Sequence, residues 1–217
     1  MNLLSNFKTR TKIISGFLLT TVLMVVVGCY GMINMNKINN NGGSMYHDNL
    51  IPIQILGQVS ENEMEARAEL ESIFVNNDAV ALTSAVDNIN KLSADSDTIL
   101  KQYEAAKLTD KEKELFNKFK QDSSNYRNVR NQILDYAKSS NYDQARALMA
   151  QEKSTREGSQ KDLSELITLN KNTAEELDNQ NDATFAKSYK FMLGLLIFAI
   201  LAAIALGIFF SEIIVRS

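Results

Sequence analysis

Hydrophobic residues follow two different patterns along the chain. Two runs are uncharged and almost continuously apolar, residues 13–36 and Phe191–Ser211. At a rise of about 1.5 Å per residue, the second run forms a helix of roughly 30 Å, the hydrocarbon thickness of a bilayer. In residues 37–190, by contrast, apolar side chains recur at spacings of three and four, which is typical of amphipathic helices that pack together. The two patterns predict two membrane-spanning helices on either side of a helical domain.

Four amphipathic helices are predicted within residues 37–190. The sequence NNNGGS at 39–44 predicts a break before the first, and Pro52 fits its first turn. The predicted buried stripes are Leu56, Val59, Glu63, Ala66, Leu70 and Ile73; then Leu82, Ala85, Ile89, Leu92, Ser96, Ile99, Tyr103 and Ala106; then Leu115, Phe119, Asp122, Tyr126, Val129, Ile133 and Tyr136; and finally Ala145, Leu148, Glu152, Thr155, Leu163, Leu166, Asn170, Leu177 and Phe185.

Short polar segments separate these helices. Turns are predicted at residues 76–78 and 139–141, with Asn141 as an N-cap, and Thr109 and Glu112 have the spacing of a capping box. Short turns between amphipathic helices favour antiparallel packing. The fourth helix is predicted to start at Tyr142 and, with no later Pro, to continue into the second span. The predicted fold is all-α: an antiparallel four-helix up-down-up-down bundle whose first and last helices continue into two transmembrane helices.

The distribution of charge predicts the orientation in the membrane. Lys8, Arg10 and Lys12 precede the first span, and positive residues favour the cytoplasmic side. Residues 37–190 hold 19 Lys and Arg against 25 Asp and Glu, a net charge of −6. We therefore expect a cytoplasmic tail at 1–12, a first span at 13–36, an extracytoplasmic sensor domain at 37–190, a second span at 191–211 and a cytoplasmic segment at 212–217.

One alternative concerns the first span. Val26, Val27, Gly28 and Cys29 match the cleavage box of a lipoprotein, in which Cys29 would become a lipidated N-terminus. The uncharged run continues beyond Cys29, however, and is longer than the roughly 7–15 residues of a signal-peptide core. A membrane span is the favoured interpretation, and the lipoprotein stays an open alternative.

Composition argues against catalysis and cofactor binding. The chain has one Cys and one His among 217 residues, and it lacks the P-loop, GxGxxG, HExxH and GxSxG patterns. Its many carboxylates are spread along helices without a diagnostic spacing. We expect a protein that is not an enzyme, has no catalytic residues, uses no cofactor, binds no metal and does not bind nucleic acid.

Two segments carry a family resemblance. The segments are MYHDNLIPI at residues 45–53, after the first span, and SNYDQARALMA at residues 140–150, before the long last helix. In this order the chain resembles the four-helix-bundle sensor region of bacterial methyl-accepting chemotaxis receptors. The resemblance implies a homodimer that responds to a small molecule or to a ligand-loaded binding protein. It also implies a HAMP linker and a signalling coiled coil after the second span.

Four arginines are the candidate ligand-binding residues. Arg67, Arg127, Arg130 and Arg156 fall about 9–15 residues from the predicted turns near 77 and 140, or roughly 15–20 Å along the helices. Arginine forms bidentate hydrogen bonds with carboxylates, so a site for a carboxylate or an amino acid is one hypothesis. The alternative is that the arginines pair with carboxylates of the chain, for which the candidates are Glu63, Glu69, Glu71, Asp122 and Glu152.

The polar stripe residues also allow two interpretations. Glu63, Ser96 and Asp122 could fix the register of the helices or line a ligand cleft. Tyr103, Tyr126 and Tyr136 are expected in the core rather than as a stacking platform for a ligand. The leading functional hypothesis is a transmembrane chemoreceptor sensing module. The alternatives are the sensor half of a histidine kinase or diguanylate cyclase, and a membrane-tethered structural or partner-binding bundle.

Overall fold

The computed structural model describes residues 9–75 and 78–215 of the 217-residue chain, and every regular element within those ranges is a helix. The all-α prediction is confirmed. In chain order the elements are α1 (Thr9–Ser44), the π-helix η1 (Met45–Leu50), α2 (Ile51–Ser72), α3 (Ala79–Glu104), α4 (Asp110–Lys138), α5 (Tyr142–Ala147) and α6 (Met149–Val215).

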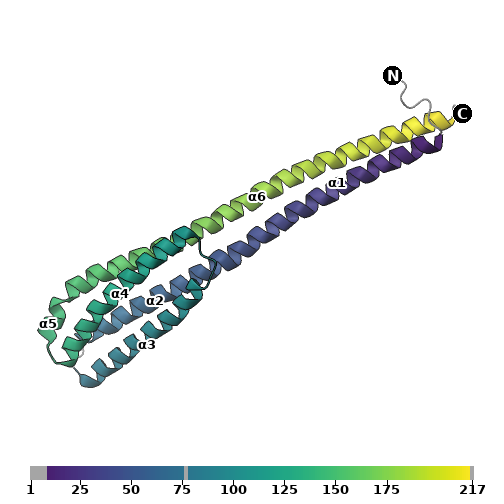
Figure 1. Ribbon diagram of the computed structural model, residues 1–217. Coiled ribbons are helices and arrows are strands. Elements are labelled where there is room, and N and C mark those ends of the chain that lie inside the picture. The colour runs from purple at the N-terminus through teal and green to yellow at the C-terminus, as the bar shows by residue number, and fades with distance from the viewer. Residues whose placement is uncertain (1–8, 76–77, 216–217) are drawn as a thin grey trace. The chain divides into compact units, whose positions relative to one another are not determined.

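The chain divides into two compact units, residues 43–176 and residues 1–42 with 177–217. In the first unit, α2, α3, α4 and the N-terminal part of α6 lie side by side, and successive helices run in opposite directions (Figure 1). This is the predicted up-down-up-down four-helix bundle. Its interior contains two apolar clusters.

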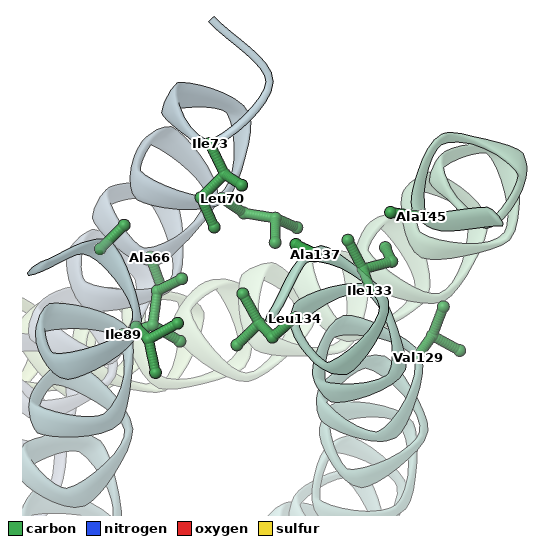
Figure 2. Close-up of a cluster of buried hydrophobic side chains, with 11 residues drawn as sticks. Ala66, Leu70, Ile73, Ile89, Val129, Ile133, Leu134, Ala137 and Ala145 are labelled. Carbon is green, nitrogen blue, oxygen red and sulfur yellow. The ribbon is translucent and has the colours of Figure 1, made fainter. Parts of the chain in front are cut away.

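The first cluster, here the Ile89 cluster, joins helices α2 to α5. Figure 2 shows Leu70 of α2, Ile89 of α3 and Leu134 of α4 pointing toward one another, while Ile133 faces Ala145 of α5. Each fully buried Leu or Ile contributes about 1.5–3 kcal/mol. The buried members are Ala66, Leu70, Ile73, Ala85, Val86, Ile89, Val129, Ile133, Leu134, Ala137 and Ala145.

The second cluster, here the Phe119 cluster, is built around aromatic rings. The ring centroids of Tyr103 and Phe116 are 5.0 Å apart and those of Phe116 and Phe119 are 6.3 Å apart, within the range of favourable aromatic pairs. Burial raises the pKa of Tyr103 to about 12. The buried members are Ile55, Leu56, Val59, Tyr103, Phe116, Phe119, Leu163 and Leu166.

The predicted helix caps are largely confirmed. The backbone N–H of Thr109 donates to Glu112 Oε2 at 2.7 Å, and the backbone N–H of Glu112 donates to Thr109 Oγ1 at 3.3 Å, which completes the capping box. Asp78 caps α3 by accepting from the backbone N–H of Val80 at 3.2 Å, whereas the other two residues of that predicted turn lie outside the described ranges. Asn141 occupies the predicted N-cap position but makes no side-chain capping bond.

Ser140 ends the turn after α4 in an unusual conformation. It has a φ of 58°, in the left-handed region that glycine normally occupies. The backbone N–H of Ser140 donates to Ala137 O and that of Asn141 donates to Tyr136 O, the two hydrogen bonds of a Schellman motif. The turn therefore has the usual hydrogen bonds of a Schellman motif, but the left-handed conformation of Ser140 has a steric cost.

Two boundary predictions are wrong. Residues 39–44 do not interrupt the helix, because α1 continues to Ser44 and passes directly into η1. Each helical glycine costs only about 1 kcal/mol, which a continuous hydrogen-bond ladder can offset. The last helix does not start at Tyr142 either: α5 ends at Ala147, and α6 begins at Met149. The backbone N–H of Leu148 donates to Ala145 O at 3.3 Å in a tighter turn, and Ala145 packs into the Ile89 cluster.

The predicted stripe is displaced by one residue in parts of α4. Asp122 is only partly buried and Tyr136 is 38% exposed, while the neighbouring Ser123 and Ala137 are buried. Phe185, predicted at the end of the last stripe, is also exposed. A strict repeat of three and four drifts relative to the 3.6-residue helical period, so a stripe extended over several turns shifts to a neighbouring position.

The second unit contains α1 and the C-terminal part of α6, which lie side by side in opposite directions (Figure 1). The rings of Tyr30 and Phe191 are 4.4 Å apart, and Asn41 Nδ2 donates to Asn181 Oδ1 at 2.9 Å. Two described stretches, Ile13–Ser72 and Met149–Phe209, contain windows long and apolar enough to cross a membrane. Only 6% and 0% of those windows are buried, so they are not core helices of this chain.

Candidate functional site

A layer of buried polar residues separates the two apolar clusters of the bundle. On α2, for example, Glu63 lies between Val59 of the Phe119 cluster and Ala66 of the Ile89 cluster. All members of this polar layer are at most 5% exposed. They are Glu63 on α2, Ser96 on α3, Ser123 and Arg130 on α4, and Ser159 on α6.

Glu63 connects three helices within this layer. Its Oε1 accepts hydrogen bonds from Ser159 Oγ of α6 at 3.1 Å and from Ser123 Oγ of α4 at 3.4 Å. Burial raises the pKa of Glu63, and this effect exceeds the opposing influence of the two serines and of Arg127 and Arg130. The carboxyl group is thus bonded to its neighbours but destabilised in its charged form.

Arg130 is buried without a carboxylate partner. Its Nη2 donates to Ser93 Oγ at 2.9 Å and its guanidinium lies 5.4 Å from the ring centroid of Tyr126. Within residues 9–75 and 78–215, no carboxylate oxygen lies within 4.0 Å of this guanidinium, and its buried Nε has no hydrogen-bond partner. Burial therefore lowers the pKa of Arg130. An incompletely bonded guanidinium in the core is costly and marks a candidate anion-binding group.

Arg127 lies next to Arg130 but nearer the surface. Its Nη1 donates to Asp97 Oδ1 of α3 at 2.6 Å, which links α3 to α4. A cavity of about 10 Å³ is lined by Glu63, Ser93, Ser96, Arg127 and Arg130, among others, and has about the volume that one water molecule requires. The structure therefore gathers two of the four predicted site residues around Glu63.

Arg156 and Arg67 form a second group, around Glu152. Arg156 and Glu152 are both buried on α6 and form an ion pair of 3.1 Å, while Arg156 Nη1 also donates to Gln160 Oε1 at 3.2 Å. Arg67 forms an exposed ion pair of 2.9 Å with Glu71 on α2. Burial raises the pKa of Glu152, and the positive charges of Arg156 and then Arg67 oppose this effect. Both arginines already have carboxylate partners within the chain.

Sequence reasoning missed several polar residues of the interior. Asp162 of α6 is fully buried and pairs with Lys118 of α4, and Ser159 bonds to Glu63. Continuing from Glu152 at spacings of three and four would have included Ser159 as well as Leu163, so the sequence did contain this signal. Asp97 lies outside the predicted stripe of α3, and no spacing indicated its role.

A groove of about 580 Å³ lies between α3 and α4. Its lining includes the ion pair between Asp97 and Arg127 and a second, of 2.7 Å, between Glu104 and Lys120. Lys120 also lies over the ring of Phe116, 4.8 Å from its centroid. Within the described ranges, no group of three or more His, Cys, Asp or Glu side chains is placed to hold a metal ion.

These features define a class of protein: a helical bundle with a polar, partly charged interior, attached to a pair of apolar helices. Residues 6–185 match the family described as "Four helix bundle sensory module for signal transduction", and the chain belongs to this family. This finding confirms the resemblance to chemoreceptor sensor regions and assigns the chain to a signalling module that is not an enzyme.

A curated relative agrees with this assignment. The chain is 22% identical over 203 residues to a protein of Bacillus subtilis (strain 168) named "Putative sensory transducer protein YvaQ". The match covers 92% of the chain and 35% of the relative. The chain thus spans about a third of the length of that relative.

Proposed function

We propose that the chain is the sensing module of a transmembrane chemoreceptor, which detects an extracytoplasmic signal and passes it to a cytoplasmic signalling domain. The observation that carries this proposal is helix α6, which begins at Met149 in the bundle and continues without a break to Val215, through the second apolar run. A continuous helix can convey a small displacement or rotation, provided that the bundle has two discrete arrangements.

The proposed topology places both termini in the cytoplasm and residues 37–190 outside it. The support is the basic segment before the first span and the net charge of −6 between the spans. In a Cys29→Ser background, a cysteine at Asn128 should react in intact cells with a membrane-impermeant maleimide. A cysteine at Thr11 should react only after the cells are permeabilised. The reverse labelling pattern contradicts the topology.

The proposed stimulus is a small molecule with a carboxylate, an amino acid among the possibilities, bound directly or presented by a binding protein. Arg67, Arg127, Arg130 and Arg156 are the candidate contacts, and a homodimer is the proposed functional unit. A guanidinium suits a carboxylate because it donates two parallel hydrogen bonds. Each arginine either contacts the ligand or only pairs with a carboxylate of the chain. In the first case its substitution abolishes ligand binding, and in the second case it alters only the stability of the bundle.

Signal transmission through α6 can be tested without knowing the ligand. We would fuse the chain to a cytoplasmic kinase reporter and insert one to four alanines after Ala183. Each added residue rotates the following helix by about 100°, so kinase output should vary with insert length and return toward the starting value after four residues. Output that does not depend on the insert length, or on the presence of the bundle, contradicts the proposal.

A further inference from the structure

The π-helix η1 lies where the first long helix enters the bundle. Helices α1, η1 and α2 follow one another without an intervening turn, and the residues at both junctions, Ser44 and Ile51, have right-handed helical dihedral angles. The backbone N–H of Ile51 donates to Tyr46 O, five residues earlier, whereas an α-helix has a spacing of four. The helix is therefore continuous but contains one wider turn.

Pro52 gives a physical reason for this wider turn. Because α1 and η1 precede it without a break, Pro52 is an interior residue of a continuous helix and not the start of a free one. Proline has no backbone N–H, and inside an α-helix its ring clashes with the carbonyl four residues earlier, here that of Asp48. A wider turn at this point relieves a conflict that a regular α-helix would keep.

The side chain of Asn49 stabilises the wider turn. Asn49 is 3% exposed, and its Nδ2 donates to Ser44 O at 3.0 Å, again across five residues. Asn34 and Asn170 lie in regular α-helix, and their side chains donate instead to the carbonyls four residues earlier. The hydrogen bond of Asn49 therefore belongs to the π form of this segment.

A π turn holds one extra residue of helical register. Converting η1 to an α-helix would rotate the residues before it by about 100° about the helix axis. Gly42 and Gly43 directly precede η1, and the low helix propensity of glycine lowers the cost of rearranging this part of α1. Helix α6, by contrast, is an α-helix throughout from Met149 to Val215, so a change in η1 changes which face of α1 meets α6.

We propose that η1 is a register switch of the first helix, with a π form held by Pro52 and Asn49 and an α form as its second state. In the α form, Gly42 takes the place that Asn41 now holds against α6. Register changes only by whole residues, so the two states are discrete, as a signalling transition requires. The signalling role of the switch rests on the proposed function and adds the first span to α6 as a second route, whereas the switch itself does not depend on that function.

Two pairs of cysteines report on the register. Asn41 Nδ2 donates to Asn181 Oδ1 at 2.9 Å, whereas a Cβ at Gly42 would meet no atom of another helix within 4 Å. In the full chain with Cys29→Ser, in oxidised membrane vesicles, Asn41→Cys with Asn181→Cys should form a disulfide. Gly42→Cys with Asn181→Cys should not. Labelling the remaining thiols with a polyethylene-glycol maleimide counts disulfides within a chain, while disulfides between chains give a dimer on the gel.

Substitutions in and after η1 should move the cross-link. Pro52→Ala restores the missing N–H and removes the ring, so the ratio of the Gly42 pair to the Asn41 pair should rise at least about tenfold. Asn49→Leu keeps the volume but removes the donor to Ser44 O, and it should raise this ratio about threefold. Gly57→Ala also increases helix propensity, but in open space on α2. It is the matched control and should leave the ratio unchanged.

A compensating deletion separates the register from other effects of losing the proline. Removing the exposed His47 from Pro52→Ala takes out the one residue that the π turn holds, so the flanking helices regain their original phase. The Asn41 pair should then cross-link again in preference to the Gly42 pair. A cytoplasmic kinase reporter fused to the chain should change its output at least about twofold in Pro52→Ala and return to the parent value after the deletion.

Three results would overturn the proposal. Cross-linking that stays with the Asn41 pair in Pro52→Ala contradicts the switch itself. A changed register with unchanged kinase output contradicts its signalling role, while the alanine insertions after Ala183 still decide whether α6 transmits a signal. A change in output that the deletion of His47 does not reverse shows that Pro52 acts through something other than register.

Discussion

The two apolar clusters and the polar layer between them are stabilised in different ways. The Ile89 and Phe119 clusters bury aliphatic and aromatic side chains whose contribution depends on area and fit. The polar layer holds Glu63 and Arg130 at 5% and 4% exposure, yet they form no ion pair with each other within 4.0 Å. The clusters fix the bundle, whereas the layer keeps charged groups that could be bonded in more than one way.

This difference indicates which part of a helical bundle can rearrange its contacts. A close-packed apolar cluster has one favourable arrangement, since a shift of the helices opens voids. A hydrogen-bonded layer can exchange partners at smaller cost, since Glu63 Oε1 already accepts from both Ser123 and Ser159.

The largest effect should come from the Phe119 cluster. Phe119→Ala removes a fully buried ring and should lower the free energy of unfolding by about 3–5 kcal/mol. Pulse proteolysis of the full chain in urea and detergent micelles measures this change. Val80→Ala, at an exposed position of α3, is the control and should stay within about 0.5 kcal/mol of the parent. Comparable effects of the two substitutions contradict the assignment of the core.

Two arginines should differ sharply in the same assay. Arg156→Ala leaves the buried carboxylate of Glu152 without its partner and should cost about 3 kcal/mol. Arg67→Ala breaks only an exposed pair with Glu71 and should cost at most about 0.5 kcal/mol. If Arg67→Ala is the more harmful change, the division between buried and exposed pairs is wrong.

The polar layer should respond to pH through Glu63. Because its pKa is raised in the folded state, the folded protein binds this proton more tightly than the unfolded protein does. Stability therefore falls as the pH rises from about 4.5 through the folded pKa. Glu63→Gln should remove much of this slope and raise stability at neutral pH by about 1–2 kcal/mol.

Glu152, whose pKa is also raised, should keep part of the slope in Glu63→Gln. Unfolding measured between pH 4 and 8 provides the comparison. A variant as pH-dependent as the parent, and no more stable, would show that the charged form of Glu63 is well accommodated.

The smallest effect should come from the turn after α4. Ser140→Gly relieves the left-handed conformation without altering the Schellman hydrogen bonds and should raise the free energy of unfolding by about 0.5–1 kcal/mol. Ser139→Gly, one residue earlier in an ordinary conformation, should not stabilise the bundle. Equal gains in both variants would contradict a steric cost located at Ser140, because glycine makes the unfolded chain more flexible and by itself lowers stability.

Much of the fold could be predicted from the sequence, because periodicity reports directly on burial. The stripe from Leu56 to Ile73 is buried as predicted, including its one charged member, Glu63. The capping box at Thr109 was predictable because it is a local motif. The continuous helix through residues 39–44 was not predictable from the sequence. The low helix propensity of glycine is a local property, and it does not report the helical hydrogen bonds on either side of the segment.

The candidate site could be predicted only in part. The four arginines were identifiable by type and position along the helices, but their partners depend on which helix faces meet. Arg127 pairs with Asp97 and Arg130 packs on Tyr126, and neither partner was among the carboxylates expected. The groove between α3 and α4 results from packing that is uneven around the bundle, and helical periodicity carries no information about it.

The most direct test is the pKa of the Glu63 carboxyl in the full chain, measured from its ¹³C resonance as the pH is varied. The structure predicts a value above the ordinary 4.5, with a further rise in Ser159→Ala, which removes a hydrogen bond to the charged form. A pKa at or below 4.5, unchanged in Ser159→Ala, would contradict a buried polar layer that links α2, α4 and α6.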